Sequence, residues 1–310
     1  MGEFQPGGHS AGPSGLLRRR SLLAAAAGLA MTGLAACAQE PAAAPVPSPS
    51  APSTPVVKDP PHNAVAPETR PARPSKSQVV AEFSARKPVE WGLDVKGVIS
   101  KTDSPHAVLT FDACGGPQGS ECDQRLLQTL RKLNVPATLF VNGRWISANP
   151  GLAAELAADP LFELGNHGFR HQPLSVNGRA AYGIPGTANA GEVYDEIMAN
   201  QDALERLSGK APRFFRSGTA YYDDVAAAIT NAVGLVPVSF TVNGDGGATF
   251  PAATVAAEVG KIAAGRGAGQ IVISHFNRPA GGTADGFARA LPGLLDRGVT
   301  FARLGDTLPL

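Results

Sequence analysis

The sequence predicts an α/β fold built on a parallel sheet or barrel within a single domain. From about residue 78 onward, short apolar runs that end in a polar residue alternate with segments whose apolar residues recur at helical spacing. Strands that alternate with helices in this way indicate a parallel arrangement. In such folds the catalytic and binding residues gather at the carboxyl ends of the strands.

The expected elements follow in order along the chain. Strands are expected at 106–111, 137–141, 213–216, 236–242, 270–275 and 299–303. Helices are expected at 152–158, 193–207, 223–233, 253–264 and 285–295, with a further one after Asp123, which stands in an N-cap position ahead of leucines at helical spacing. Gly209 is expected to stop the 193–207 helix, and a long glycine-rich loop is expected over 175–190.

Composition indicates a globular domain with little net charge. With 310 residues, of which 43% are apolar, the chain can bury a sizeable core. The formal charge is +1, and the first 37 residues hold three arginines and one acid, so the remainder carries −1. A body so close to neutral has no electrostatic footprint for nucleic acid, and no nucleic-acid partner is expected.

Residues 1–37 are expected to be an export signal. The paired arginines at Arg18 and Arg19 resemble a twin-arginine signal, and the apolar stretch 22–36 that follows is too short to span a bilayer comfortably. The end of this stretch, 34–37, resembles the lipobox of bacterial lipoproteins, which makes Cys37 the expected lipid attachment site. An ordinary cleaved secretory signal and a buried helix are the alternatives.

Residues 38–77 are expected to form a tether rich in Pro and Ala. Such a segment cannot bury enough apolar area to offset its ordering entropy, and at ~3.1 Å per residue some 35 residues would span on the order of 100 Å. These features predict an exported protein that is lipid-anchored on the outer face of the bacterial cytoplasmic membrane or in the cell wall. The membrane would then be a partner, and 78–310 the folded domain.

Two histidines four residues apart are central to the candidate site. The stretch 161–171 runs from a short apolar segment into a turn that carries His167 and His171, and two imidazoles at this spacing can reach one divalent metal. A lone pair at this spacing more often binds nothing. Asp112, Arg216 and His275, each at the end of an apolar run, add the further polar groups that a site requires.

Five segments resemble, in order, the successive motifs of the polysaccharide deacetylase (NodB-homology) family. They are Thr110–Pro117, Glu163–His171, Phe214–Arg216, Val238–Asp245 and Ile273–His275, and the resemblance covers roughly residues 100 to 308. It implies a distorted (β/α) barrel of about seven strands, with 78–310 as the catalytic domain. It also implies removal of acetyl groups from N-acetylated sugars with a divalent metal, commonly zinc.

The resemblance assigns the central steps of such a reaction to four residues. Asp112 matches the general base, and His275 matches the general acid that protonates the departing nitrogen. His167 and His171 match the metal ligands, and a metal there would lower the pKa of its water toward 7. A solvated aspartate and a buried structural histidine are the alternatives for Asp112 and His275.

Four further residues receive supporting roles. Arg216 and Asp245 match positions that tune the charge states of the catalytic aspartate and histidine. Tyr221 is the nearest analogue of the family's aromatic residue, and Asn277 is a polar group that could face the pocket, so both are candidates for substrate binding. A surface ion pair for the first two and a turn role for Asn277 are the alternatives.

The chain departs from the family pattern beside the base. Ala113 stands where members usually have a second aspartate that completes the metal triad. Direct coordination by Asp112, a ligand from the 175–190 loop, or water could replace it. Ser217–Tyr221 also takes the place of the prolines that usually follow the motif arginine, so the backbone N–H of an oxyanion hole is not placed by the sequence.

Two cysteines flank the loop that follows Asp112. In an exported protein Cys114 and Cys122 could form a disulfide that closes this loop. Alternatively, Cys114 could act as a thiolate metal ligand in place of the missing aspartate. The two roles exclude each other.

Three functions are consistent with these residues. The first is a metal-dependent hydrolase that removes N-acetyl groups from envelope polysaccharide, either peptidoglycan or a chitin-like glycan. The second is an amide hydrolase that acts on a non-sugar substrate. The third is a non-catalytic glycan-binding lipoprotein with a degenerate metal site, although retention of Asp112, both histidines and His275 argues against it.

Overall fold

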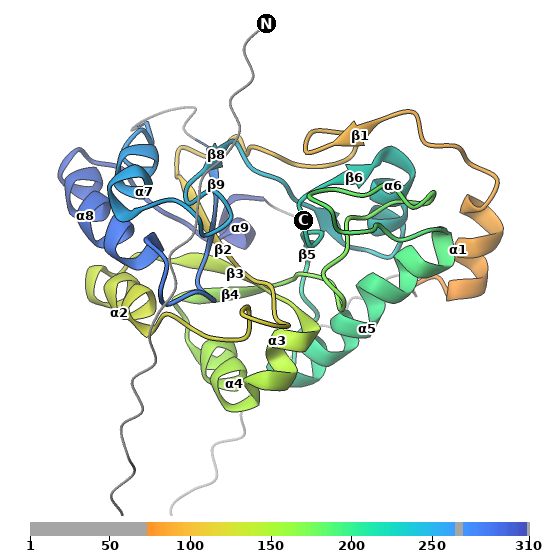
Figure 1. Cartoon of the computed structure of the whole chain (residues 1–310), viewed down its shortest axis with the longest axis horizontal. Coiled ribbons are helices and arrows are strands. Elements are labelled where there is room, and N and C mark those ends of the chain that lie inside the picture. Colours follow the sequence, from red (N-terminus) through yellow and green to blue (C-terminus); the bar gives the residue numbers. More distant parts are fainter. Residues whose placement is uncertain (1–72, 264–268, 309–310) are drawn as a thin grey trace, which may run out of the picture. The chain divides into compact units, whose positions relative to one another are not determined.

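The computed structural model describes residues 73–263 and 269–308, and the account below concerns these residues (Figure 1). The predictions for the export signal, for Cys37 and for most of the tether lie outside them. The first helix, α1 (Lys76–Phe83), begins two residues before the expected domain boundary at 78 and is capped by Ser75. None of the helices in the described part is long and apolar enough to cross a bilayer.

Seven parallel strands form the central sheet. In spatial order they are β7 (Val236–Pro237), β5 (Phe214–Phe215), β4 (Phe162–Asn166), β3 (Ala137–Val141), β2 (Val108–Ala113), β9 (Ile271–His275) and β8 (Val242–Asn243). The two edge strands, β7 and β8, are neighbours in the chain, and residues 238–241 connect them. Val238 N donates to Phe215 O and Thr241 N donates to Ile271 O, so this segment spans from one edge to the other. The sheet is therefore curled, and the predicted distorted barrel of about seven strands is confirmed.

Helices cover the sheet on its outside (Figure 1). They are α2 (Gln124–Leu133), α3 (Gly143–Ala148), α4 (Pro150–Ala158), α5 (Ala190–Ser208), α6 (Asp224–Ala232), α7 (Ala252–Val259) and α8 (Thr283–Asp296). The last helix, α9 (Leu304–Thr307), instead packs Leu304 against Val108, Phe140 and Phe214 in a third apolar cluster. In one cluster of buried apolar side chains α2, α7 and α8 pack against β2, and in a second α1, α5 and α6 pack together. A separate antiparallel pair joins β1 (Trp91–Gly92) to β6 (Tyr222–Asp223).

Local signals account for most element ends. Asp123 caps α2 as predicted, because its side chain accepts the backbone N–H of Arg125. Gly209 ends α5 with a φ of 68°, the left-handed conformation that glycine adopts without strain. The strand expected at 236–242 is instead two short strands, because the chain crosses between the sheet edges there.

The prediction of a strand at 299–303 is wrong. Phe301 forms only an isolated bridge with Ala107, because β2, which begins at the next residue, already pairs with β3 on one side and β9 on the other. The chain then enters α9. The helix expected to run to 264 ends at Val259. The helices α1, α3 and α9 and the β1–β6 pair were not among the expected elements.

Candidate active site

The register of the sheet brings the predicted residues to one edge. Asp112 of β2 pairs directly with His275 of β9. The strands β4 and β5 end one residue before His167 and Arg216, and the two strands are neighbours. Parallel strands therefore deliver all four side chains to their shared carboxyl edge.

A cavity of about 650 Å³ opens at this edge. Its wall includes Asp112, Cys114, His171 and His275, together with Tyr182 from the 175–190 loop. The predicted base and acid thus share a cavity with one predicted metal ligand. His167 lies just behind them and is 1% exposed.

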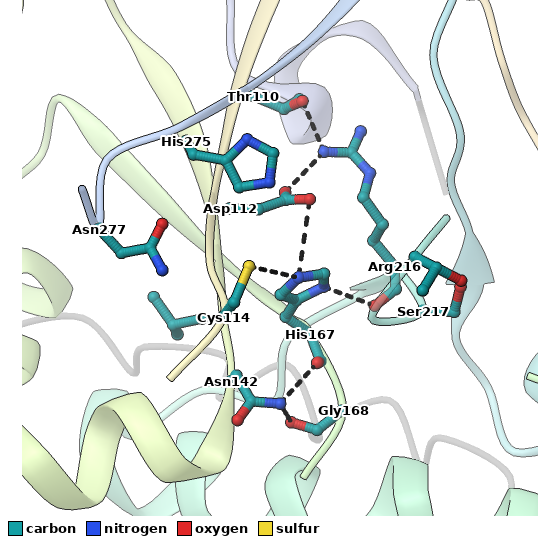
Figure 2. A network of polar contacts seen from close by, with 12 residues as sticks. Thr110, Asp112, Cys114, Asn142, His167, Gly168, Arg216, Ser217, His275 and Asn277 are labelled. Carbon is teal, nitrogen blue, oxygen red and sulfur yellow. Dashed lines mark hydrogen bonds and ion pairs between the residues drawn. The ribbon is translucent and has the colours of Figure 1, made fainter. Parts of the chain in front are cut away.

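Asp112 is a buried carboxylate paired with a buried arginine (Figure 2). Arg216 Nη1 donates to Asp112 Oδ1 at 2.8 Å and to Thr110 Oγ1 at 2.7 Å, and Arg216 Nη2 donates to the Ser239 carbonyl at 3.0 Å. The guanidinium also lies over the Phe140 ring, 4.3 Å from its centroid. A charge so deeply buried requires a partner of opposite sign. Arg216 is therefore the positively charged partner of the Asp112 carboxylate.

His167 presents one nitrogen to the site and anchors the other. Its Nδ1 lies 2.9 Å from the carbonyl oxygen of Arg216, which can only accept, so Nδ1 carries a proton. In a neutral ring the lone pair is then on Nε2, which lies 3.7 Å from Asp112 Oδ2 and 3.9 Å from Cys114 Sγ (Figure 2). Asn142 Nδ2 supports the turn by donating to the carbonyl of His167 at 3.0 Å. Burial lowers the pKa of His167, but the charge of Asp112 and the contact with Cys114 outweigh burial and raise it above its usual value.

His171 is held in place by a glutamate that the sequence interpretation missed. Its φ is 66°, which is strained for a residue with a side chain. The carboxylate of Glu196 accepts the backbone N–H groups of Arg170, His171 and Gln172 at 2.8 to 3.2 Å and so fixes this turn. Glu196 belongs to α5 and is 3% exposed. Its position on the apolar face of that helix, between Val193 and Ile197, was the available signal, because an acid at a core position needs buried donors.

Cys114 completes a group of three candidate metal ligands. The ligand atoms of Cys114, His167 and His171 all lie within 4.8 Å of one another, and within the described ranges the 175–190 loop contributes nothing to this group. Successive residues of a strand point to opposite faces. Ala113 accordingly points into the apolar core, while Asp112 and Cys114 both reach the cavity. Cys114, and not the residue directly after Asp112, is thus the one that lies beside the two histidines.

The three ligand atoms fit a small metal ion by chemistry and by distance. Thiolate and imidazole are common zinc ligands, and tetrahedral zinc would set them roughly 3.3–3.6 Å apart. The 3.9 Å between Cys114 Sγ and His167 Nε2 is close to that separation. Water or substrate would occupy the fourth position.

The disulfide allowed by the sequence does not form in the described part of the chain, where Cys114 and Cys122 are both free thiols. Burial raises the pKa of Cys122 to about 12, with a further increase from Asp123. Burial also raises the pKa of Cys114, but His171 and His167 outweigh it and hold the pKa well below its usual value. Cys114 is therefore the thiol that can serve as a thiolate.

His275 and Asp245 form a buried ion pair at the other side of the cavity. His275 Nδ1 lies 3.0 Å from Asp245 Oδ1, and the backbone N–H of His275 and the hydroxyl of Thr283 both donate to Asp245 Oδ2, at 2.6 and 2.9 Å. Burial lowers the pKa of His275, but Asp245 outweighs this effect and raises it well above its usual value. The ring is therefore protonated near neutral pH, as a general acid must be.

The two predicted substrate-binding residues have supporting positions. Asn277 is 1% exposed, and its Nδ2 donates to the carbonyl of Gly119, so it positions the loop that forms part of the cavity wall. Tyr221 packs between the rings of Trp91 and Tyr182. Of these three aromatic residues, Tyr182 is the one that lines the cavity.

A buried carboxylate base, an imidazolium acid and a group of metal-ligand type at the strand ends of an α/β barrel are the parts of a metal-assisted hydrolase. The model of the polysaccharide deacetylase family matches residues 99–238 of this chain. A curated relative, the peptidoglycan-N-acetylglucosamine deacetylase of Listeria monocytogenes, is 29% identical over 167 residues, which are 54% of this chain and 31% of the relative. The chain spans between 27% and 60% of the length of the first curated relatives that it matches.

Solved structures share the fold at low identity. A peptidoglycan N-acetylglucosamine deacetylase superposes with a TM-score of 0.58 at 22% identity, covering 68% of this chain and 92% of that one. A CE4 family pseudoenzyme from Bacillus anthracis superposes with a TM-score of 0.56 at 20% identity, covering 70% of each chain. These similarities establish the fold alone, so activity has to be argued from the site.

Proposed function

We propose that this protein is a metal-dependent hydrolase that removes N-acetyl groups from envelope polysaccharide, with peptidoglycan or a chitin-like glycan as substrate. The observation that carries the proposal is the meeting of Asp112, Cys114, His171 and His275 at one cavity, with His167 directly behind them. A base, an acid and metal ligands are the groups that a metal-assisted amide hydrolysis uses to move protons and to activate water. The names of the relatives support an N-acetylated glycan as the substrate class.

The proton steps follow from the hydrogen bonds. Asp112 Oδ2 takes a proton from the attacking water, since Oδ1 is already bonded to Arg216. His275 gives its Nε2 proton to the departing nitrogen, because Nδ1 is bonded to Asp245. The C–N bond breaks and the products are acetate and a free amine. A divalent metal in the site would supply polarisation of the acetyl carbonyl and a lower pKa for water.

Zinc is the metal that we propose, with His167, His171 and Cys114 as its protein ligands. Magnesium, calcium and manganese prefer oxygen ligands, whereas thiolate and imidazole together suit zinc. Cobalt(II) can test the assignment, since a thiolate bonded to cobalt adds a near-ultraviolet charge-transfer band to the visible spectrum. We expect this band in the wild type and in Cys122→Ser, its loss in Cys114→Ser, and the loss of cobalt binding in His167→Ala. A wild type that binds cobalt without the band would remove Cys114 from the ligand set and favour Asp112 or water.

Acetate release distinguishes this function from the alternatives. The wild type is expected to release acetate from chitooligosaccharides or peptidoglycan, to lose this activity with a chelator and to regain it with zinc. Release from simple acetamides alone would favour the non-sugar amide hydrolase. Binding of glycan without acetate release, at full zinc occupancy, would favour the non-catalytic lipoprotein.

The location proposed for this activity is outside the cytoplasm, at the end of a lipid-anchored tether. It rests on the arginine pair, the lipobox-like ending at Cys37 and the Pro/Ala-rich segment of the sequence. Envelope glycan would be within reach of a domain held in that way. Metabolic labelling with a fatty acid, compared between the wild type and Cys37→Ala, tests the anchor directly.

A further inference from the structure

The 175–190 loop carries a tight hairpin at the rim of the cavity. Ala181 and Ile184 pair antiparallel, with backbone hydrogen bonds of 3.1 and 2.9 Å in the two directions. Tyr182 and Gly183 form the turn with φ values of 52° and 76°. Both positive values belong to a type I′ turn, in which Asn, Asp and Gly are favoured at the first position. A tyrosine there holds a strained backbone.

Neither the backbone nor the core explains why a tyrosine stands at this position. The side chain of Tyr182 is 74% exposed, so packing inside the domain does not compensate for the strain. The same ring lines the cavity that holds Asp112 and His275. A large ring that is both exposed and strained beside reacting groups indicates contact with a ligand.

The tyrosine is the outer member of a row of aromatic rings. Its centroid lies 5.4 Å from that of Tyr221 at an interplanar angle of 89°, and Tyr221 lies 5.6 Å from Trp91. Arg179 covers Trp91 with its guanidinium 5.0 Å from the ring centroid. Edge-to-face packing restrains Tyr182 from one side and leaves its other surface open. The row is therefore a rigid support for a ring that faces solvent.

We propose that Tyr182 is a stacking platform for the pyranose ring of the sugar unit next to the one whose acetamido group enters the cavity. The inference rests on the proposed function and deepens it: the substrate is a chain of at least two sugars. The face of a pyranose presents C–H groups, and these pack on the open face of an aromatic ring with loss of apolar surface to water.

Tyr182→Asn separates a binding role from a structural one. Asparagine suits the first position of a type I′ turn, so the variant is expected to keep or raise the Tm of the wild type. Loss of the platform is expected to raise the Kd for N-acetylchitotetraose by about tenfold, the factor for roughly 50 Å² of lost apolar contact. The Kd for N-acetylglucosamine should stay unchanged, and Tyr182→Phe should bind both sugars like the wild type.

The measurement is isothermal titration calorimetry of both sugars with the three proteins in the presence of chelator, which prevents hydrolysis, alongside acetate release from the tetramer by the zinc-loaded proteins. The platform is refuted if the wild type and Tyr182→Asn bind the tetramer with the same Kd. It is also refuted if the variant loses affinity for both sugars by the same factor. If the wild type releases acetate and Tyr182→Asn binds the tetramer with the same Kd, the proposed function holds and the platform does not. If binding of the tetramer depends on Tyr182 but no protein releases acetate, the platform holds and the proposed hydrolase activity does not.

Discussion

Replacing Asp245 by asparagine tests how His275 acquires the proton that it is proposed to donate. An aspartate offers two acceptor oxygens here, one to His275 Nδ1 and the other to the backbone N–H of His275 and the hydroxyl of Thr283. An asparagine has one acceptor and one donor. Because the backbone N–H can only donate, the amide oxygen must face it, and the amide NH₂ then faces Nδ1. His275 must accept at Nδ1, so the ring becomes neutral and is a far weaker acid.

The size of the effect follows from the role of the proton. General acid catalysis contributes about 10²–10⁴-fold, and the tautomer change in a comparable aspartate–histidine pair costs about 10⁴-fold in kcat. We therefore expect Asp245→Asn to lower kcat by about 10²–10⁴-fold with little change in KM. Loss of a charge-assisted hydrogen bond should also lower the free energy of unfolding by about 1.5–3 kcal/mol.

The pH dependence gives the sharper readout. The pair holds the pKa of His275 well above 6.5, so activity in the wild type should fall only as the pH rises through that raised pKa. In the variant this alkaline limb should move to lower pH. The ion pair stabilises the folded protein fully below pH 6.5, and this contribution is lost as the pH rises through the raised pKa of His275. The difference in Tm between the two proteins should therefore narrow at alkaline pH.

Acetate release from N-acetylchitotetraose across the pH range is the assay, and Thr283→Val is the matched control. The control removes one hydrogen bond to Asp245 Oδ2 and keeps its charge, so we expect a loss of at most about tenfold. If Asp245→Asn keeps the kcat and the alkaline limb of the wild type, His275 does not donate a proton under the control of Asp245.

Three further variants test the rest of the site. Arg216→Met leaves the buried charge of Asp112 without its partner and should lower the free energy of unfolding in urea by about 3–5 kcal/mol; an unchanged urea midpoint would show that the pair is dispensable. Gly218→Ala would push a Cβ into the backbone of His171 and should weaken zinc affinity about 10–100-fold in a competition titration, whereas an unchanged affinity would mean that the turn can yield. Burial raises the pKa of Glu196 above 4.5, so the contribution of the protonated carboxyl to the stability of the folded protein is lost as the pH rises through that raised pKa. The Tm of the wild type should therefore decline relative to that of Glu196→Gln above pH 4.5, and parallel curves would contradict this.

The sequence was sufficient where a residue's role depends on its own strand. Asp112 and His275 each end an apolar run, and parallel pairing of those runs is enough to bring the two side chains together. The same reasoning placed His167 and Arg216 at the ends of β4 and β5. Alternating strands and helices likewise sufficed for the fold class.

Features that depend on distant segments could not be predicted in this way. The support of His171 comes from Glu196, 25 residues further along the chain. The role of Cys114 depends on the strand alternation that turns Ala113 toward the core, and a motif comparison that aligns residues one by one does not register it. The exposed Tyr182 requires knowledge of a hairpin inside a loop that has no apolar pattern.

The crossing segment 238–241 connects the closure of the barrel to the charge of Asp112, the proposed base. Ser239 N donates to the carbonyl of Ile99, while the Ser239 carbonyl accepts from the arginine that pairs with Asp112. The backbone of one residue thus both ties the crossing segment to Ile99 and anchors the arginine that pairs with Asp112. A change in the length of this crossing would loosen Arg216 directly, even where the seven strands still form. Such a change would weaken the ion pair of Asp112 while Asp112, Arg216 and His275 all stay in the sequence.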